Sequence, residues 1–403
     1  MCIRDSFLSV AAAVFLGVLG YSMYRVARPE SRGELGATLS VAEVMGEGGE
    51  AGFARAREPR PFRFPEDHGP HPEHRTEWWY ITGNLEGPGN EPYGFQFTLF
   101  RSTLDPKPRE SVSAWATNQV YMGHLALTDG ASRTFRAFER FSRGGLGLAG
   151  AQARPFRVWL EDWVLEETGF SADAIFPIRL EAGEGETKLS LLLTPAKPMV
   201  LQGEDGLSQK GSEPGNASYY YSYTRLETEG TVSVQGKEVP VRGLAWMDRE
   251  WSTSALSQGQ VGWDWFALQL SDGTDLMYYQ LRLEDGTADP LSKGVLVDEA
   301  GGSRLLSSEM VDLTVQNRWR SSLDGTEYPS GWRLEIPDEG IDLQVTPLIP
   351  DQELELTFRY WEGSVTVRGT VDGRPVDGRG YVELTGYSDV DGESRTSMGR
   401  ATG

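Results

Sequence analysis

The chain has 403 residues and a formal net charge of −21 at pH 7, with 38 Lys and Arg against 59 Asp and Glu. This acidic balance argues against nucleic acid as a partner, because phosphate binding needs a basic face. The single cysteine, Cys2, excludes an internal disulfide framework and a cysteine-based zinc site. The length allows two domains, each with a core of its own.

The N-terminal segment is typical of an exported protein. An apolar run at residues 7–24 precedes Arg25 and Arg28. Its length fits both a secretory signal and a membrane anchor. We therefore expect residues 1–28 to direct the chain to the periplasm or out of the cell, as a cleaved signal or as a tether to the inner membrane. Residues 29–60, rich in Gly, Glu, Arg and Ala, are expected to be a flexible tether.

Beyond the tether, the pattern is that of β-strands. Residues 77–85 and 93–101 form two β-rich runs around a turn that contains Gly and Pro. Residues 262–270 and 275–283 form a second pair around an Asp-Gly turn. Both pairs predict β-hairpins. No long stretch has helical periodicity, so the sequence predicts an all-β protein.

Short motifs recur in the same order in the two halves of the chain. The matched motifs are Arg179-Leu180-Glu181 with Arg333-Leu334-Glu335, Gly230-Thr231-Val232 with Gly369-Thr370-Val371, and Arg242-Gly243 with Arg379-Gly380. We interpret this order as a tandem duplication, with copy one at residues 61–253 and copy two at residues 254–400. An antiparallel sheet repeated once most simply closes into two barrels, which removes exposed strand edges.

Two tryptophan-rich acidic motifs stand out, Glu77-Trp78-Trp79-Tyr80 and Trp246-Met247-Asp248-Arg249-Glu250-Trp251. A carboxylate among aromatic rings is costly unless it is paired, solvated or protonated. The motifs therefore indicate a structural ion pair, a proton donor with a raised pKa, or the mouth of an apolar cavity. In the alignment of the two copies Asp248 corresponds to Thr385, so this acid is special to copy one.

These motifs, together with His124-Leu125-Ala126-Leu127-Thr128-Asp129, Gly262-Trp263-Asp264-Trp265-Phe266 and the run from Gly380 to Tyr387, resemble the AttH / carotenoid 1,2-hydratase (CrtC-like) family. The resemblance covers nearly everything after residue 60. It implies two tandem lipocalin-like antiparallel β-barrels and a large apolar ligand of isoprenoid, lipid or polyketide-like character. In the hydratase branch it implies addition of water to a terminal carotenoid double bond.

Hydration of an alkene needs an acid that can protonate carbon, and a carboxyl group in an apolar pocket can be that acid without a cofactor. Asp248 matches the acidic position of the family and is the expected donor, with Glu250 and Glu77 as rivals or partners. We expect the three carboxyl groups to converge at the cavity of the first barrel, and we expect Arg249 to lower the pKa of Asp248. The expected ligand-binding residues are Trp78, Trp79, Tyr80, His124, Tyr219, Tyr221, Trp246 and Trp251. For His124 the alternative is a hydrogen-bonded position in the core.

Other patterns are less specific. Prolines around His68, His71 and His74 favour an exposed loop, and no metal site is predicted. No G-x-S-x-G elbow and no Ser-His-Asp set is visible in the sequence, so a hydrolase nucleophile is not indicated. Three functions remain open: an exported protein that binds a large apolar ligand and serves an envelope exporter, a hydro-lyase or isomerase that acts through Asp248, and a scaffold without a small ligand.

Overall fold

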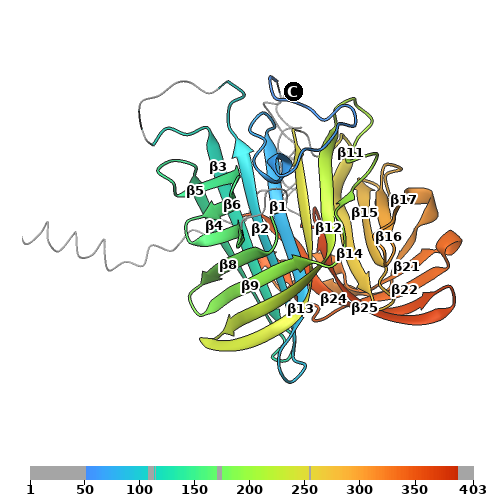
Figure 1. The fold of residues 1–403 in the computed structure, drawn as a ribbon. Coiled ribbons are helices and arrows are strands. Elements are labelled where there is room, and N and C mark those ends of the chain that lie inside the picture. Colours follow the sequence, from blue (N-terminus) through green and yellow to red (C-terminus); the bar gives the residue numbers. More distant parts are fainter. Residues whose placement is uncertain (1–50, 108–112, 114, 170–174, 254–255, 389–403) are drawn as a thin grey trace, which may run out of the picture. The chain divides into compact units, whose positions relative to one another are not determined.

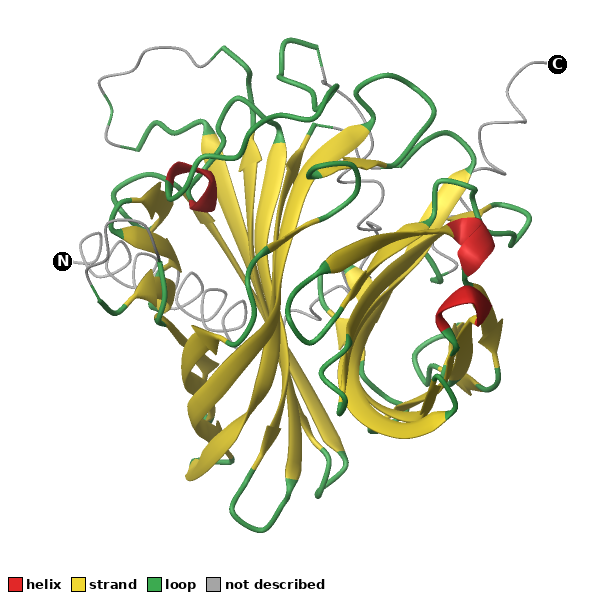
Figure 2. Ribbon diagram, turned by 45° about the vertical axis from the view of Figure 1, so that its right-hand side comes forward, coloured by secondary structure: helices red, strands yellow, loops and turns green. Residues whose placement is uncertain are grey.

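The computed structural model describes residues 51–107, 113, 115–169, 175–253 and 256–388. Within these ranges the chain contains antiparallel strands and three short 3₁₀ helices, and no α-helix (Figures 1 and 2). The 3₁₀ helices are η1 (Glu66–His68), η2 (Ser308–Met310) and η3 (Pro337–Glu339). The all-β prediction is therefore confirmed. A helix long and apolar enough to cross a membrane is absent from the described ranges, and the expected export segment at residues 1–28 lies outside them.

The first sheet has thirteen strands and curls into a nearly closed barrel. In spatial order, its main path consists of β4 (Thr134–Arg143), β3 (Gln119–Asp129), β2 (Pro92–Thr103), β1 (Thr76–Glu86), β13 (Lys237–Ser252), β12 (Ala217–Val234), β9 (Thr187–Pro195), β8 (Ile178–Glu184), β7 (Trp163–Glu167), β6 (Phe156–Leu160) and β5 (Ala149–Ala153). Two short strands, β10 (Val200–Leu201) and β11 (Leu207–Gln209), pair with β12.

The second sheet has ten strands. Its main path consists of β17 (Ser303–Ser307), β16 (Lys293–Val297), β15 (Asp275–Leu283), β14 (Gln260–Leu270), β25 (Arg374–Leu384), β24 (Arg359–Val371), β22 (Ile341–Pro347), β21 (Trp332–Ile336) and β18 (Asp312–Val315), and β23 (Glu353–Glu355) pairs with β24. A separate hairpin joins β19 (Arg318–Arg320) to β20 (Glu327–Pro329).

The two sheets share one strand order. The path β4-β3-β2-β1-β13-β12-β9-β8 corresponds to β17-β16-β15-β14-β25-β24-β22-β21. The matched sequence motifs occupy equivalent strands, namely β8 and β21, β12 and β24, and β13 and β25. Both predicted hairpins are present, as β1 with β2 and β14 with β15. The common order is what a tandem duplication of one sheet produces.

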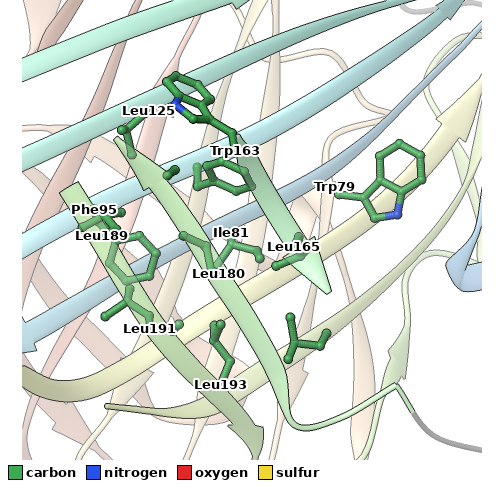
Figure 3. Packing of buried hydrophobic residues seen from close by; sticks show 14 of the residues in the cluster. Trp79, Ile81, Phe95, Leu125, Trp163, Leu165, Leu180, Leu189, Leu191 and Leu193 are labelled. Atoms are coloured by element: carbon green, nitrogen blue, oxygen red, sulfur yellow. The ribbon is translucent and has the colours of Figure 1, made fainter. Parts of the chain in front are cut away.

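Apolar side chains fill the interior of the first barrel. Figure 3 shows Ile81 of β1 and Phe95 of β2 near Leu189 and Leu191 of β9, with Trp79 farther along β1. These positions alternate along their strands, because successive side chains of a strand point to opposite faces. The second sheet encloses a core of its own.

The outward faces of the two sheets meet in a third cluster. Its buried members are Tyr80, Tyr220, Trp246, Trp265, Ala267, Met277, Tyr279, Leu281 and Tyr381. Polar bonds also cross this interface: the Tyr80 hydroxyl donates to Glu362 Oε1 at 2.6 Å, and Asn84 Nδ2 donates to the Gly380 carbonyl oxygen at 3.0 Å. The two halves therefore share a buried, partly polar interface.

The junction between the two sheets lies between Ser252, where β13 ends, and Gln260, where β14 begins. The domain ranges 61–253 and 254–400 stay predictions. Part of the expected tether is packed instead of free. Ala56 is fully buried, and the Ala54 carbonyl oxygen accepts a hydrogen bond from Thr253 Oγ1.

Candidate functional site

A cavity of about 110 Å³ lies between the two sheets, not inside the first barrel where the sequence placed it. It is lined by Trp78, Tyr80, Phe100, Lys210, Ser218, Tyr220, Asp248, Glu250, Ser252, Leu256, Trp263, Trp265, Tyr279, Leu281, Tyr360 and Glu383. The volume is several times what one water molecule needs, about 10–15 Å³ on the same measure. Aromatic walls with a few convergent polar groups are typical of small-molecule sites.

Alternation along β13 selects which side chains reach this cavity. Asp248 and Glu250 line it, and Trp246 belongs to the cluster between the sheets. The intervening Met247 packs in the core of the first barrel, and Trp251 packs in a separate aromatic cluster on the side of β13 away from the cavity. The acidic motif thus divides between two faces of one strand.

Three donors hold Asp248 in place. Tyr220 donates its hydroxyl to Oδ2 at 2.6 Å, and Trp246 Nε1 donates to Oδ1 at 2.7 Å. The third donor is the hydroxyl of Ser222, which is directly opposite Asp248 on β12. Tyr80 is the opposite neighbour on β1. This environment fixes the orientation of the carboxyl group.

Burial raises the pKa of Asp248 to about 7, although the hydrogen bonds from Ser222, Tyr220 and Trp246 act in the opposite direction. The expectation that Arg249 lowers this pKa is wrong. The Arg249 guanidinium lies on the other face of β13, where it pairs with Glu77. Asp248 is therefore poised to hold or release a proton near neutral pH.

Glu250, which lines the cavity with Asp248, is paired with a lysine. Lys210 Nζ lies 3.3 Å from Glu250 Oε1 and 4.0 Å from the centre of the Tyr279 ring. Burial lowers the pKa of Lys210, but its interactions with Glu250 and Tyr279 together outweigh burial, so the pKa is raised overall. Ser218 donates a further hydrogen bond to Glu250. The cavity thus holds an ion pair in addition to Asp248.

The second copy also supplies carboxyl groups. Glu383 lines the cavity and accepts a hydrogen bond from Trp263 Nε1 at 2.6 Å. Glu362 lies directly opposite Glu383 on β24. Burial raises the pKa of both, and the negative charge of Glu383 raises that of Glu362 further. Thr385, which corresponds to Asp248 in copy two, carries no carboxyl group. Copy two nevertheless supplies a carboxyl group to the cavity through Glu383.

Glu77 does not join Asp248 and Glu250, so the predicted convergence of three carboxyl groups is wrong. Its side chain is fully buried in a structural ion cluster with Arg101 and Arg249. His71 adds a backbone N–H bond at 3.0 Å. Burial raises the pKa of Glu77, but the two guanidinium groups outweigh it and hold the pKa well below its usual range.

The three N-terminal histidines are buried and not on an exposed loop. His68 Nδ1 bonds to the Tyr221 hydroxyl at 2.6 Å, and His71 bridges Asp67 and Glu77. Burial lowers the pKa of His68 to about 3. Among the residues that the structure describes, no group of three or more His, Cys, Asp and Glu side chains is arranged to hold a metal ion.

Four of the eight predicted ligand-binding residues face away from the cavity. Trp78 and Tyr80 line it, whereas Trp79 lies in the core of the first barrel. Tyr219, Tyr221 and Trp251 pack together in the separate cluster described above.

Residues that the sequence reasoning missed take their place: Tyr220, Trp263, Trp265, Tyr279, Tyr360, Lys210 and Glu383. Period-two alternation could have indicated Tyr220, because a run of consecutive tyrosines on a strand must divide between two faces.

His124 is fully buried behind the cavity wall. Its Nε2 lies 3.2 Å from Glu139 Oε1, and its Nδ1 lies 2.8 Å from the hydroxyl oxygen of Tyr360, which lines the cavity. His124 therefore reaches the cavity through Tyr360 and does not line it.

A family model described as AttH-like matches residues 55–387. The chain belongs to the AttH family. A solved structure assigned as AttH from Nitrosomonas europaea is 37% identical to this AttH-family chain, with a TM-score of 0.73 over 83% of this chain and 100% of that one. The structure of kievitone hydratase from Nectria haematococca has a TM-score of 0.63 at 18% identity over 84% of this chain and 98% of that one, which shows the same fold.

Two fungal relatives are similar in sequence. Kievitone hydratase of Fusarium solani subsp. phaseoli is 25% identical over 228 residues, which cover 53% of this chain and 61% of the relative. The dehydratase asqC of Emericella nidulans is 23% identical over 226 residues, which cover 54% of this chain and 63% of the relative. Each match spans less than two thirds of the relative. The protein is thus a lipocalin-like member of the AttH family with hydratase-type relatives.

Proposed function

We propose that this AttH-family protein is a hydro-lyase-type enzyme that adds water to, or removes water from, an apolar small molecule held between the two sheets. The observation that carries the proposal is Asp248, a buried carboxyl group with a pKa of about 7 that is oriented by three donors beside an aromatic cavity. The names of the two fungal relatives, a hydratase and a dehydratase, support the same class of reaction.

The chemistry follows from the groups that line the cavity. In the hydration direction, protonated Asp248 gives its proton to one alkene carbon, and a cation develops on the other carbon. The faces of Trp78, Trp265 and Tyr220 stabilise that cation without capturing it. Water then adds to the cation and loses a proton. Dehydration is the reverse sequence, in which Asp248 protonates the departing hydroxyl group.

A second candidate function is binding of a large apolar ligand, such as an isoprenoid, lipid or polyketide-like compound, without turnover. The aromatic lining of the cavity favours it, because such walls recognise apolar rings and chains whether or not a reaction follows. In this case Asp248 would orient the ligand by hydrogen bonding.

The site of action is part of the proposal. The apolar run at residues 7–24 supports export to the periplasm or beyond, with the option of a tether to the inner membrane. An envelope exporter would be the partner of a ligand-carrying protein in that compartment.

Turnover of two probes, kievitone and an acyclic carotenoid, tests the proposal by detection of a product heavier by one water. Asp248→Asn should lower kcat by about 100-fold or more while ligand binding persists, because general acid catalysis contributes about 10²–10⁴-fold. Thr385→Val, at the equivalent position of copy two, is the matched control and should keep wild-type turnover. Binding of a probe without turnover in the wild type would favour the second candidate.

A further inference from the structure

His124 belongs to the same cross-strand row as Asp248. Reading across six adjacent strands, directly opposed residues are Ser222, Asp248, Tyr80, Thr98, His124 and Glu139. Residues in one such row point to the same face of a sheet. His124 therefore faces the second sheet, as Asp248 does, although 124 residues separate them in the chain.

A chain of hydrogen bonds runs from the cavity through this histidine toward the surface. Tyr360 lines the cavity, and its hydroxyl lies 2.8 Å from His124 Nδ1. His124 Nε2 lies 3.2 Å from Glu139 Oε1. The His124 side chain is fully buried, whereas that of Glu139 is 14% exposed. Glu139 Oε2 also accepts a bond from Thr357 Oγ1 at 2.6 Å.

The protonation states fix the direction of these bonds. Burial raises the pKa of Glu139, but the hydrogen bonds from His124 and Thr357 outweigh it and lower the pKa overall. Burial lowers the pKa of His124, so its ring is neutral. Because a carboxylate only accepts, Nε2 carries the ring proton and Nδ1 accepts from the Tyr360 hydroxyl.

Tyr360 keeps its own proton at neutral pH. Burial raises its pKa well above the ordinary value, and the negative charges of Glu362 and Glu383 add to this. Its hydroxyl hydrogen points to His124, so an oxygen lone pair remains available on the same atom. Each donor of the chain therefore points away from the cavity, toward Glu139.

We propose that Tyr360, His124 and Glu139 form a proton relay that carries one proton out of the cavity during hydration and returns it during dehydration. This proposal rests on the function proposed above. The water that adds to the cation gives a proton to the Tyr360 oxygen, Tyr360 gives its own proton to His124 Nδ1, and His124 gives the Nε2 proton to Glu139. Asp248 has lost one proton to carbon and Glu139 has gained one, so the count balances. Loss of the Glu139 proton to solvent, return of the ring hydrogen of His124 from Nδ1 to Nε2, rotation of the Tyr360 hydroxyl hydrogen back toward His124, and uptake of a proton by Asp248 restore the starting state.

Tyr360 is the catalytic member of this relay, and His124 and Glu139 act through it. The relay also needs both copies of the duplication, because His124 and Glu139 lie on β3 and β4 whereas Tyr360 lies on β24. The first barrel alone would have the proton donor but no outlet for the second proton.

The hydrogen-bond arrangement can be tested without a substrate. The whole chain has only four histidines, so ¹⁵N-histidine labelling of the intact protein gives a simple NMR spectrum. We expect a neutral His124 ring with hydrogen on Nε2, and we expect Tyr360→Phe to shift the Nδ1 resonance toward that of a nitrogen without a hydrogen bond. Tyr278→Phe, in the core of the second sheet, is the control and should leave His124 unchanged. Hydrogen on Nδ1, or a charged ring near neutral pH, would overturn the relay.

Kinetics with the same two probes test the transfer itself. Tyr360→Phe should lower kcat by about 100-fold with little change in KM, as expected for loss of a proton-transfer group. Glu139→Gln should cause part of that loss, because the amide keeps the hydrogen bonds but cannot take up a proton. Tyr278→Phe should retain wild-type kcat.

The two proposals fail in different ways. Wild-type kcat in Tyr360→Phe, with Asp248→Asn inactive, would overturn the relay and leave the proposed function standing. Absence of wild-type turnover with both probes would count against the proposed function and against the relay with it, whereas the NMR outcome would still decide whether the hydrogen-bonded chain from Tyr360 to Glu139 exists.

Discussion

Replacement of Asp248 by Asn should stabilise the protein at alkaline pH and change its stability little in acid. Burial raises the pKa of Asp248 from its ordinary value of 3.8 to about 7 in the folded chain. Between these two values the folded chain binds more protons than the unfolded chain does, so the free energy of unfolding falls as pH rises. The asparagine variant has no titratable group at this position, so its free energy of unfolding should not show this fall with pH.

The size of the effect follows from the two pKa values. Each tenfold change in an acid dissociation constant is worth about 1.4 kcal/mol. The rise to about 7 therefore costs the wild type about 4 kcal/mol once pH exceeds it, for a residue that is 3% exposed. Asn keeps an oxygen for Ser222 and Trp246 but places an amide group at Tyr220, which costs about 1 kcal/mol at every pH.

Urea unfolding followed by tryptophan fluorescence, at several pH values from about 4 to about 8, measures this difference. We expect Asp248→Asn to gain about 4 kcal/mol relative to wild type across that range. Thr385→Val changes the equivalent position of copy two without a titratable group, so its difference from wild type should not depend on pH. A pH-independent difference for Asp248→Asn, or one that falls as pH rises, would refute the argument from burial.

Three further predictions follow from the site and the N-terminus. Glu77→Gln should lower the free energy of unfolding by about 3–5 kcal/mol in urea titrations, because it leaves two buried guanidinium groups without their carboxylate. Glu66→Gln, at an exposed pair with Arg154, should change it by less than about 1 kcal/mol. Tyr220→Phe removes a donor to the carboxylate form of Asp248, so the pH-dependent loss of stability should extend to higher pH. A reporter fused after residue 60 should be active outside the cytoplasm, and cytoplasmic activity would contradict export.

The class of fold follows from local patterns in the sequence. Alternation of apolar residues and the residues of tight turns act over a few neighbours, so they predict the β1–β2 and β14–β15 hairpins without any knowledge of distant segments. The ordered motifs likewise predict a duplication, and the common strand order of the two sheets agrees with it.

The sequence also indicated the acid, but not the face of the sheet on which it lies. Period-two alternation separates Asp248 and Glu250 from Arg249 and Trp251, whichever face is buried. Glu77 is acidic and flanked by tryptophan like the others, yet it pairs opposite Trp251 and shares that face. The composition of a motif does not reveal this, because Glu77 and Trp251, which the register between β1 and β13 places opposite each other, are 174 positions apart in the chain.

The position of the cavity, between the sheets and not inside the first barrel, depends on how the two sheets pack together. The barrel interior is filled by its own apolar side chains, and the cavity lies instead where the outward faces of the two sheets meet. That meeting brings Tyr360 to His124, which are 236 positions apart in the chain. Such a contact depends on how two complete sheets pack, and the short-range patterns that predict each strand place no constraint on it.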